Sequence, residues 1–305
     1  MDQTYIETVR LLLEAAPVIF EAPAFAMKGG TAINLFVQDL PRLSVDIDVV
    51  YTGHTQSRQE ALQSISLALE TTRVRLAKAG LEADTSSPKE ADEIKLFLRR
   101  GRSQVKVEVN HVFRGTVLPV VRRRLGAEAR RLFTTELIVP LLATPELYGS
   151  KLVAALDRQH PRDLFDVLGM FERSGLSPEV VECFVCYLAG HNRPVHEVLF
   201  SRDQDMSRAF DNEFIGLTRQ AIALEQLVAV RRQLKAQLPS ALTENHRRFL
   251  LGLVTGEPDW SLMRCAHLAQ LPAIRWKVQN LAKLKQANPR KFAQQANELR
   301  ARFGL

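Results

Sequence analysis

The sequence of 305 residues contains only three cysteines, an odd number that argues against a disulfide framework. Cys183 and Cys186 form a single C-x-x-C pair inside an apolar helical pattern, with no second pair at zinc spacing. A structural zinc site needs four converging ligands, and the candidates for further ligands are Cys265, His267 and His191. The sequence therefore predicts buried thiols at these positions in preference to a metal centre.

Long apolar runs are also missing. No stretch reaches the roughly 18 apolar residues that a membrane-spanning helix requires, and the first four residues lack the basic-then-apolar order of a signal peptide. There is no internal repeat and no low-complexity tract. With 46% hydrophobic and 25% charged residues, the composition is typical of an ordinary globular protein. We therefore expect a cytoplasmic protein without a membrane partner and, at this length, two domains.

Basic residues are unevenly distributed along the chain. The net charge is +7, but residues 95–131 carry 11 basic against 2 acidic side chains, and residues 271–305 carry 8 against 1. Segregated positive charge is typical of proteins that bind phosphodiesters, because Lys and Arg displace the counterions of nucleic acids. Two solvated basic faces without a partner are the alternative.

The stretch from Phe25 to Tyr51 carries the pattern most typical of a phosphate-binding site. A short apolar run ends at Gly29 and Gly30, and two glycines allow the backbone to approach a ligand closely. Thr31 and the amides that follow it would hold an anion at the start of a helix. The segment predicts a strand, a glycine turn and a helix start, followed by a second strand.

Two aspartates lie in the alternating segment from Val45 to Val49. Asp46 and Asp48 would project from the same face of a strand, about 6.6 Å apart along it, while the apolar residues between them face a core. Such a pair would suit divalent metal ions roughly 3.5–4 Å apart. An edge strand with two solvated aspartates is the alternative, because structural carboxylates outnumber catalytic ones.

These residues resemble the signature of a known family. Two segments resemble the nucleotidyltransferase motif of the AbiEii family, which is the toxin half of AbiE and MenT type toxin-antitoxin systems. The segments are Lys28-Gly29-Gly30-Thr31-Ala32 and Arg42-Leu43-Ser44-Val45-Asp46-Ile47-Asp48. In the wider superfamily a Gly-Ser dipeptide holds the triphosphate, and Thr31 stands at the position of that serine. The resemblance implies an α+β fold in which a polymerase-beta-like mixed sheet with helices precedes an all-helical domain.

Helices are predicted over residues 5–16 and 57–80, before a strand hairpin at residues 94–98 and 105–109. On the second strand of this hairpin, Glu108 shares the polar face with Lys106. Glu108 would then face the same cleft as the two aspartates, as a metal ligand or as the base for an attacking hydroxyl. A simple ion pair with Lys106 on an exposed face is an equal alternative.

From Thr144 to the end the pattern is helical, which predicts a catalytic domain over residues 1–143 and a helical domain over residues 144–305. Lys151 on the first of these helices is followed, after a break at His160-Pro161, by Asp163 and Asp166. Taken alone, a lysine and two aspartates on adjacent helices are most often a surface ion-pair set with little energy at stake.

The same segment also resembles a second AbiEii motif, in which a lysine helix precedes an Arg-Asp pair and a further aspartate three residues on. The resemblance implies that Lys151 contacts the nucleotide phosphates and that Asp166 completes the active site. Arg162 and Asp163 are weaker candidates for nucleotide binding. Beyond residue 170 no signature is matched. Trp260 and Trp276 are predicted to anchor the core, because both are flanked by apolar residues at helical spacing, and platforms for base stacking are the alternative.

Together these patterns predict a Mg²⁺-dependent nucleotidyltransferase that moves a nucleotide from an NTP to an acceptor hydroxyl. The resemblance implies tRNA 3′ ends as acceptor and a cognate antitoxin as protein partner. Nucleotidylation of a protein hydroxyl and a catalytically quiet RNA-binding module are the alternatives. The predicted catalytic residues are Asp46, Asp48, Glu108, Lys151 and Asp166, with Asp46 and Asp48 as metal ligands. The predicted nucleotide-binding residues are Lys28, Gly29, Gly30, Thr31, Lys151, Arg162 and Asp163.

Overall fold

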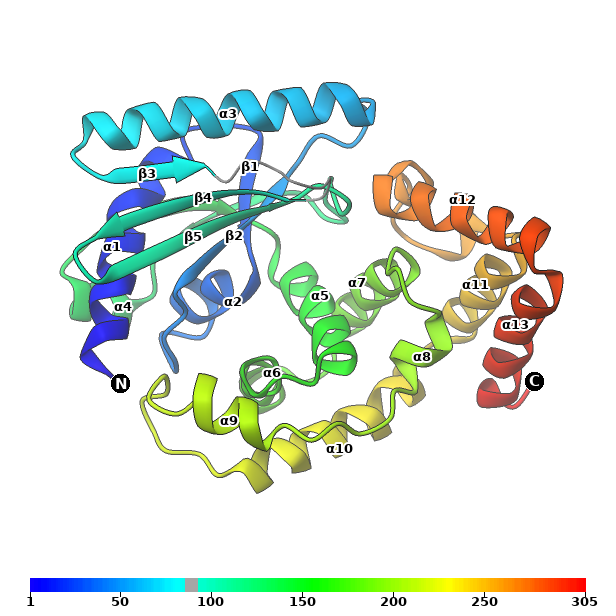
Figure 1. The fold of residues 1–305 in the computed structure, drawn as a ribbon. Helices are drawn as coiled ribbons and strands as arrows, with labels where there is room; N and C mark the ends of the chain where they lie inside the picture. Colours follow the sequence, from blue (N-terminus) through cyan, green and yellow to red (C-terminus); the bar gives the residue numbers. More distant parts are fainter. Residues whose placement is uncertain (86–92) are drawn as a thin grey trace. The chain divides into compact units, whose positions relative to one another are not determined.

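The structure, a computed structural model, describes residues 1–85 and 93–305. The chain forms two compact units, which are Met1–Leu147 with Phe214–Ile222 and Tyr148–Glu213 with Ala223–Leu305 (Figure 1). The first unit contains a mixed β-sheet with helices, and the second unit is helical. This architecture confirms the predicted fold class.

The sheet that the described residues form has seven strands in the order β3-β4-β5-β2-β1-β7-β6. Central strand β2 pairs antiparallel with β1 and parallel with β5, and β1 pairs parallel with β7. The remaining pairs are antiparallel. The strands are β1 (Phe25–Lys28), β2 (Asp46–Tyr51), β3 (Glu82–Thr85), β4 (Glu93–Arg100), β5 (Ser103–Asn110), β6 (Val121–Arg124) and β7 (Ile138–Leu141).

Two helices cover one face of this sheet. Helix α1 packs against β5 and α3, and α3 packs against β3 and β4 (Figure 1). Strand β5 buries Val105, Val107 and Val109 completely, whereas Lys106 and Glu108 alternate with them and are half-buried. The predicted hairpin is therefore confirmed, with its polar residues on the opposite face. The helices of the first unit are α1 (Gln3–Ile19), α2 (Gly29–Ala32), α3 (Arg58–Lys78) and α4 (Ala127–Phe133), and a π-helix, η1 (Ile33–Val37), directly follows α2.

The local sequence determines where helix α3 begins and ends. Ser57 Oγ accepts a hydrogen bond from the backbone N–H of Glu60, and the Glu60 carboxylate accepts one from the backbone N–H of Ser57. This capping box satisfies two amide donors that the first turn leaves without helical partners. After the helix, Gly80 adopts a φ of +80°, which confirms it as the predicted end signal.

The helical unit is built around α7, whose residues from Val180 to Ala189 are all buried. Helices α8, α10 and α11 pack against α7, α10 also packs against α6, and α13 packs against α8, α11 and α12. All three cysteine thiols are buried, as predicted. The helices are α5 (Thr144–Asp157), α6 (Pro161–Arg173), α7 (Pro178–Ala189), α8 (Val195–Leu199), α9 (Ser207–Glu213), α10 (Leu224–Ala241), α11 (Glu244–Thr255), α12 (Pro272–Ala287) and α13 (Pro289–Phe303), with 3-10 turns η2 (Trp260–Leu262) and η3 (Leu268–Gln270).

The segment Phe214–Ile222 belongs to the first unit, although the sequence predicted that all residues after 143 form the helical domain. The backbone N–H of Leu43 donates to the carbonyl of Leu217 at 2.9 Å, and that of Arg219 donates to Pro41 at 3.0 Å. Backbone hydrogen bonds of this kind leave no hydropathy pattern, so the sequence could not indicate them. Within the described ranges, no helix has both the length and the hydropathy of a membrane span.

Candidate functional site

The turn after β1 brings the backbone of Gly29 against Asp48. Gly29 has a φ of +75°, and a Cβ atom built on it would lie 2.0 Å from Asp48 Oδ2. A Cβ on Gly30 would lie 2.8 Å from Nη2 of Arg42. Gly29 is therefore required both by the close approach of the short Asp48 side chain and by its left-handed backbone, whereas the close neighbour of Gly30 is the far end of a longer side chain.

Replacing Gly29 by alanine should displace the Asp48 carboxylate. A non-glycine residue in this backbone region costs about 1–2 kcal/mol, and displacing a reactive group by about 1 Å costs up to roughly 10²-fold in rate. We expect Gly29→Ala to lower both the free energy of unfolding and the rate of nucleotide transfer. The matched control is Gly101→Ala, because Gly101 also has a positive φ, +58°, but has nothing within 4 Å of the added methyl group. Equal transfer rates for the two variants would contradict the placement of Asp48.

Thr31 and Asn34 fasten the glycine turn. Thr31 is fully buried, and its hydroxyl donates to the backbone carbonyl of Asp46 and lies 3.0 Å from Ser44 Oγ. The Asn34 side-chain amide donates to the carbonyl of Gly30 at 2.9 Å. The Thr31 hydroxyl, which was predicted to help hold a phosphate, thus bonds to the strand that carries the aspartates.

Strand β2 presents its two aspartates as the alternation predicts. Asp46 and Asp48 are half-buried and share one face, while Ile47 and Val49 are buried on the other. The buried side chains hold the strand in the core, so the carboxylates occupy fixed positions on the accessible face.

Charged residues continue this face across four adjacent strands. Asp48 is the Cα partner of Lys28 on β1 and of Glu108 on β5, and Glu108 is the partner of Lys95 on β4. The Glu108 carboxylate lies 2.9 Å from Lys95 Nζ and 3.0 Å from Lys106 Nζ. Burial alone would raise the pKa of Glu108, but hydrogen bonds from the two lysines outweigh burial and lower this pKa. Glu108 thus shares the face of Asp48 and also pairs with Lys106, and its role as a metal ligand or base stays a prediction.

The donor set on this face fits a divalent cation that the substrate helps to hold. Within residues 1–85 and 93–305, no group of three or more His, Cys, Asp or Glu side chains is arranged to bind a metal ion. Mg²⁺ is usually held by one or two carboxylates, water and substrate phosphates. Asp46 and Asp48 supply such a pair on the accessible face of β2, and Gly29, which has no side chain, leaves the space that the Asp48 carboxylate occupies.

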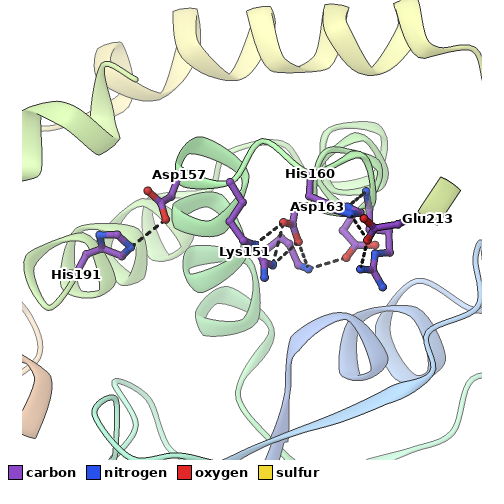
Figure 2. A network of polar contacts seen from close by, with 9 residues as sticks. Lys151, Asp157, His160, Asp163, His191 and Glu213 are labelled. Atoms are coloured by element: carbon purple, nitrogen blue, oxygen red, sulfur yellow. Dashed lines mark hydrogen bonds and ion pairs between the residues drawn. The ribbon is translucent and has the colours of Figure 1, made fainter. Parts of the chain in front are cut away.

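The second predicted motif forms a buried ion-pair cluster in the helical unit (Figure 2). Lys151 Nζ lies 2.9 Å from Asp163 Oδ1 and 2.9 Å from Asp166 Oδ2. The three side chains are 7%, 3% and 0% exposed, so the alternative of a surface ion-pair set is wrong. Arg158 adds two hydrogen bonds to Asp163, and the cluster carries two charges of each sign.

Acid should weaken the helical unit through Asp163. Burial alone would raise the pKa of this carboxyl, but Lys151 and Arg158 lower it from 3.8 to about 2. The folded state therefore binds the proton less readily, so this stabilisation is complete above pH 4 and is lost as the pH falls through 2. The difference corresponds to about 2 kcal/mol. Denaturant unfolding between pH 2 and 4 should show a shallower pH dependence for Asp163→Asn than for the wild type, and equal slopes would contradict the ion-pair assignment.

Arg162 belongs to a capping network at the start of α6 (Figure 2). Its Nη2 lies 3.4 Å from Glu213 Oε2, and His160 Nε2 lies 3.1 Å from the same oxygen. His160 Nδ1 accepts a hydrogen bond from the backbone N–H of Arg162 at 3.1 Å, which directs the proton on Nε2 toward Glu213. Arg162, a predicted nucleotide contact, thus has a partner within its own unit.

The structure brings the predicted residues together in two groups. The first unit contains Lys28, Gly29, Gly30, Thr31, Asp46, Asp48 and Glu108, and the helical unit contains Lys151, Arg162, Asp163 and Asp166. Sequence reasoning assigned no role to Arg42, whose side chain is buried behind Gly30 and donates to the carbonyl of Leu43 at 3.0 Å. Arg42 lies in a loop, where no periodic pattern indicates which side chains are buried. The sequence signal that could have indicated a role was its place in the AbiEii-like motif, two residues before Ser44.

Comparison with known proteins identifies the family of this chain. A family model described as nucleotidyl transferase AbiEii toxin, of a type IV toxin-antitoxin system, matches residues 10–280. The chain belongs to the AbiEii family. This AbiEii protein is thus a nucleotidyltransferase of a toxin-antitoxin system, and membership implies an NTP substrate and an antitoxin partner.

The AbiEii protein also shares its fold with a solved toxin. MenT4, a nucleotidyltransferase toxin from Mycobacterium tuberculosis H37Rv, is 18% identical, with a TM-score of 0.60 over 89% of this chain and 90% of that chain. A chain of the E. coli MS115-1 CdnC:HORMA-deltaN complex aligns over 90% of this chain and 92% of its own with 12% identity, but its TM-score of 0.25 is too low for a comparison of folds. A comparison with curated protein sequences gave no match.

Proposed function

We propose that the AbiEii protein transfers a nucleotide from an NTP to the 3′ hydroxyl of RNA, with tRNA as the acceptor, in a reaction that depends on Mg²⁺. The observation that carries the proposal is the contact between the glycine turn and the aspartate strand, where Gly29 leaves space only for the Asp48 carboxylate. The resemblance to the AbiEii motifs supports the tRNA acceptor. The excess of basic residues in segments 95–131 and 271–305 also favours a nucleic acid over a protein acceptor.

In this proposal the backbone at Gly29 and Gly30 approaches the triphosphate, and Lys28 at the end of β1 adds positive charge beside it. Asp46 and Asp48 would hold the divalent ion, which supplies charge neutralisation for the phosphates. The 3′ hydroxyl oxygen forms a bond to the α-phosphorus in line with the leaving group, and the bond to pyrophosphate breaks. Thr31 acts as a positioning residue, because its hydroxyl bonds to the backbone of β2.

We assign proton removal from the acceptor hydroxyl to Glu108. The other predicted catalytic carboxylate outside the metal pair, Asp166, is fully buried and paired with Lys151, which does not suit a group that must reach the acceptor. Glu108 has a side chain that is 23% exposed, and it is in register with Asp48. Because its pKa is lowered, Glu108 is a weak base, and we expect a contribution near the lower end of the roughly 10²–10⁴-fold range of general bases.

Incubation of the purified protein with each labelled NTP, Mg²⁺ and a mixture of total RNA and protein tests the acceptor. We expect label in a product that ribonuclease destroys and proteinase does not. Periodate-oxidised RNA is the matched control, because it lacks the 3′ diol and should accept no label. Label in a proteinase-sensitive product would instead establish nucleotidylation of a protein hydroxyl.

A further inference from the structure

Helix α12 exposes a tryptophan that the sequence placed in the core. Trp276 is 50% exposed, so that prediction is wrong. The reason is geometric, since α12 buries a different face, formed by Ala273, Ile274, Lys277 and Leu281. Trp260, by contrast, packs on Phe249 with 5.7 Å between the ring centroids. Half of the Trp276 surface is therefore accessible to a ligand.

Cations and amides surround the exposed indole. Trp276, Asn280 and Lys283 recur at i, i+4 and i+7, which places them on one face of α12. Lys283 Nζ lies 5.9 Å from the centroid of the Trp276 ring, and Arg275 beside it is exposed. Residues 271–305 carry 8 basic against 1 acidic side chain, so this part of the molecule attracts a polyanion.

A pocket of about 260 Å³ adjoins the same face, since Asn280 also lines the pocket. Lys277 and Lys291 contribute positive charge to its wall, and the carboxylate that also lines it, Glu197, is paired with Arg193 Nη2 at 3.2 Å. The Lys277 ammonium is buried and donates to the backbone carbonyls of His191 at 2.9 Å and Arg193 at 2.7 Å. An ammonium has three donors, so one remains for a ligand. Burial lowers the pKa of Lys277 to about 8, and a bound anion would favour its charged form.

We infer that Trp276, Lys283 and the adjoining pocket bind a single-stranded segment of RNA. One base stacks on the indole, and a neighbouring phosphate enters the pocket between Lys277 and Lys291. Stacking tolerates any base because every base has a π-face, and lysines beside a stacking ring are typical of single-strand binding sites. The inference rests on the proposed function, because it gives the RNA acceptor a binding surface on the helical unit.

The test measures binding of a labelled uridine octamer by fluorescence anisotropy, without NTP and without divalent metal ions. Loss of a stacked base costs about 1–3 kcal/mol, so Trp276→Ala should weaken binding about 5- to 150-fold. Trp276→Phe keeps an aromatic ring and should retain most of the affinity.

Lys291→Ala should reduce the slope of log affinity against log salt by about 0.7. Arg232→Ala, an exposed arginine on α10, is the matched control and should leave affinity and slope unchanged.

Fluorescence provides a second readout. The chain has two tryptophans, so in a Trp260→Phe background the octamer should quench Trp276 directly. Equal affinities of the wild type and Trp276→Ala would overturn the inference. If Trp276→Ala impaired capture of the antitoxin but not of RNA, the face would be a protein-binding surface and the inference would be wrong. Since the assay contains no NTP, intact RNA binding without any nucleotide transfer would contradict the proposed function and leave this inference standing.

Discussion

Asp48→Asn is expected to reduce nucleotide transfer by about 10³-fold, because charge stabilisation by a bound metal is worth several kcal/mol. The amide keeps the shape of the carboxylate and removes the negative charge that holds the cation. Folding should be preserved, since Asp48 is half-buried and β2 is anchored by the buried Ile47 and Val49. The measurement is kcat/KM for transfer over a series of Mg²⁺ concentrations, together with thermal unfolding of both proteins.

Asp84→Asn is the matched control for this variant. Asp84 is exposed on β3 of the same sheet, so the chemical change is identical but lies outside the proposed site. We expect wild-type transfer from the control. Wild-type transfer by Asp48→Asn would remove Asp48 from the set of metal ligands, and a large loss of stability would show that its role is structural.

Lys151→Met is expected to lower the free energy of unfolding of the helical unit by about 3–5 kcal/mol, because removing one partner leaves buried carboxylates without their counter-charge. Asp163 keeps its hydrogen bonds from Arg158. Denaturant unfolding measures the loss. Arg158→Gln is the matched control, since the Arg158 side chain is 62% exposed and Asp163 keeps its buried contact with Lys151, so the loss should be smaller than for Lys151→Met.

The double variant Lys151→Met with Asp166→Leu separates burial from pairing. Replacing a buried ion pair by apolar side chains is often neutral, so the double variant should recover part of the stability that Lys151→Met loses. Transfer measured at a low temperature, where each variant is folded, tests the phosphate contact that the family motif implies for Lys151. Unchanged stability of Lys151→Met with a lost transfer rate would contradict the structural role and favour phosphate binding.

The aspartate face could be predicted because strand geometry leaves little freedom. A period of two residues places Asp46 and Asp48 together and Ile47 opposite them, whatever the rest of the fold is. The hairpin that carries Glu108 was predictable for the same reason. The lysine partners of Glu108 were predictable only for Lys106, which lies on the same strand, because Lys95 becomes a neighbour through strand pairing.

Burial in the helical unit could not be predicted in the same way. The short break at His160-Pro161 indicates that Lys151 and Asp166 lie on successive helices but not that their side chains are buried. The same limitation made the prediction for Trp276 wrong, since apolar neighbours at helical spacing do not identify the face that packs. The contact of Thr31 with β2 was missed because its hydroxyl bonds to a backbone carbonyl, and backbone acceptors carry no sequence signal.

The intact mass of a purified tRNA after reaction tests the central claim most directly. Incubation with an NTP, Mg²⁺ and the wild-type protein should increase the mass by one or more nucleoside monophosphate units at the 3′ end. Asp48→Asn should leave the mass unchanged under the same conditions, and Asp84→Asn should behave as the wild type. An unchanged tRNA mass with every NTP, while label from the same NTPs appears on a protein, would contradict the account.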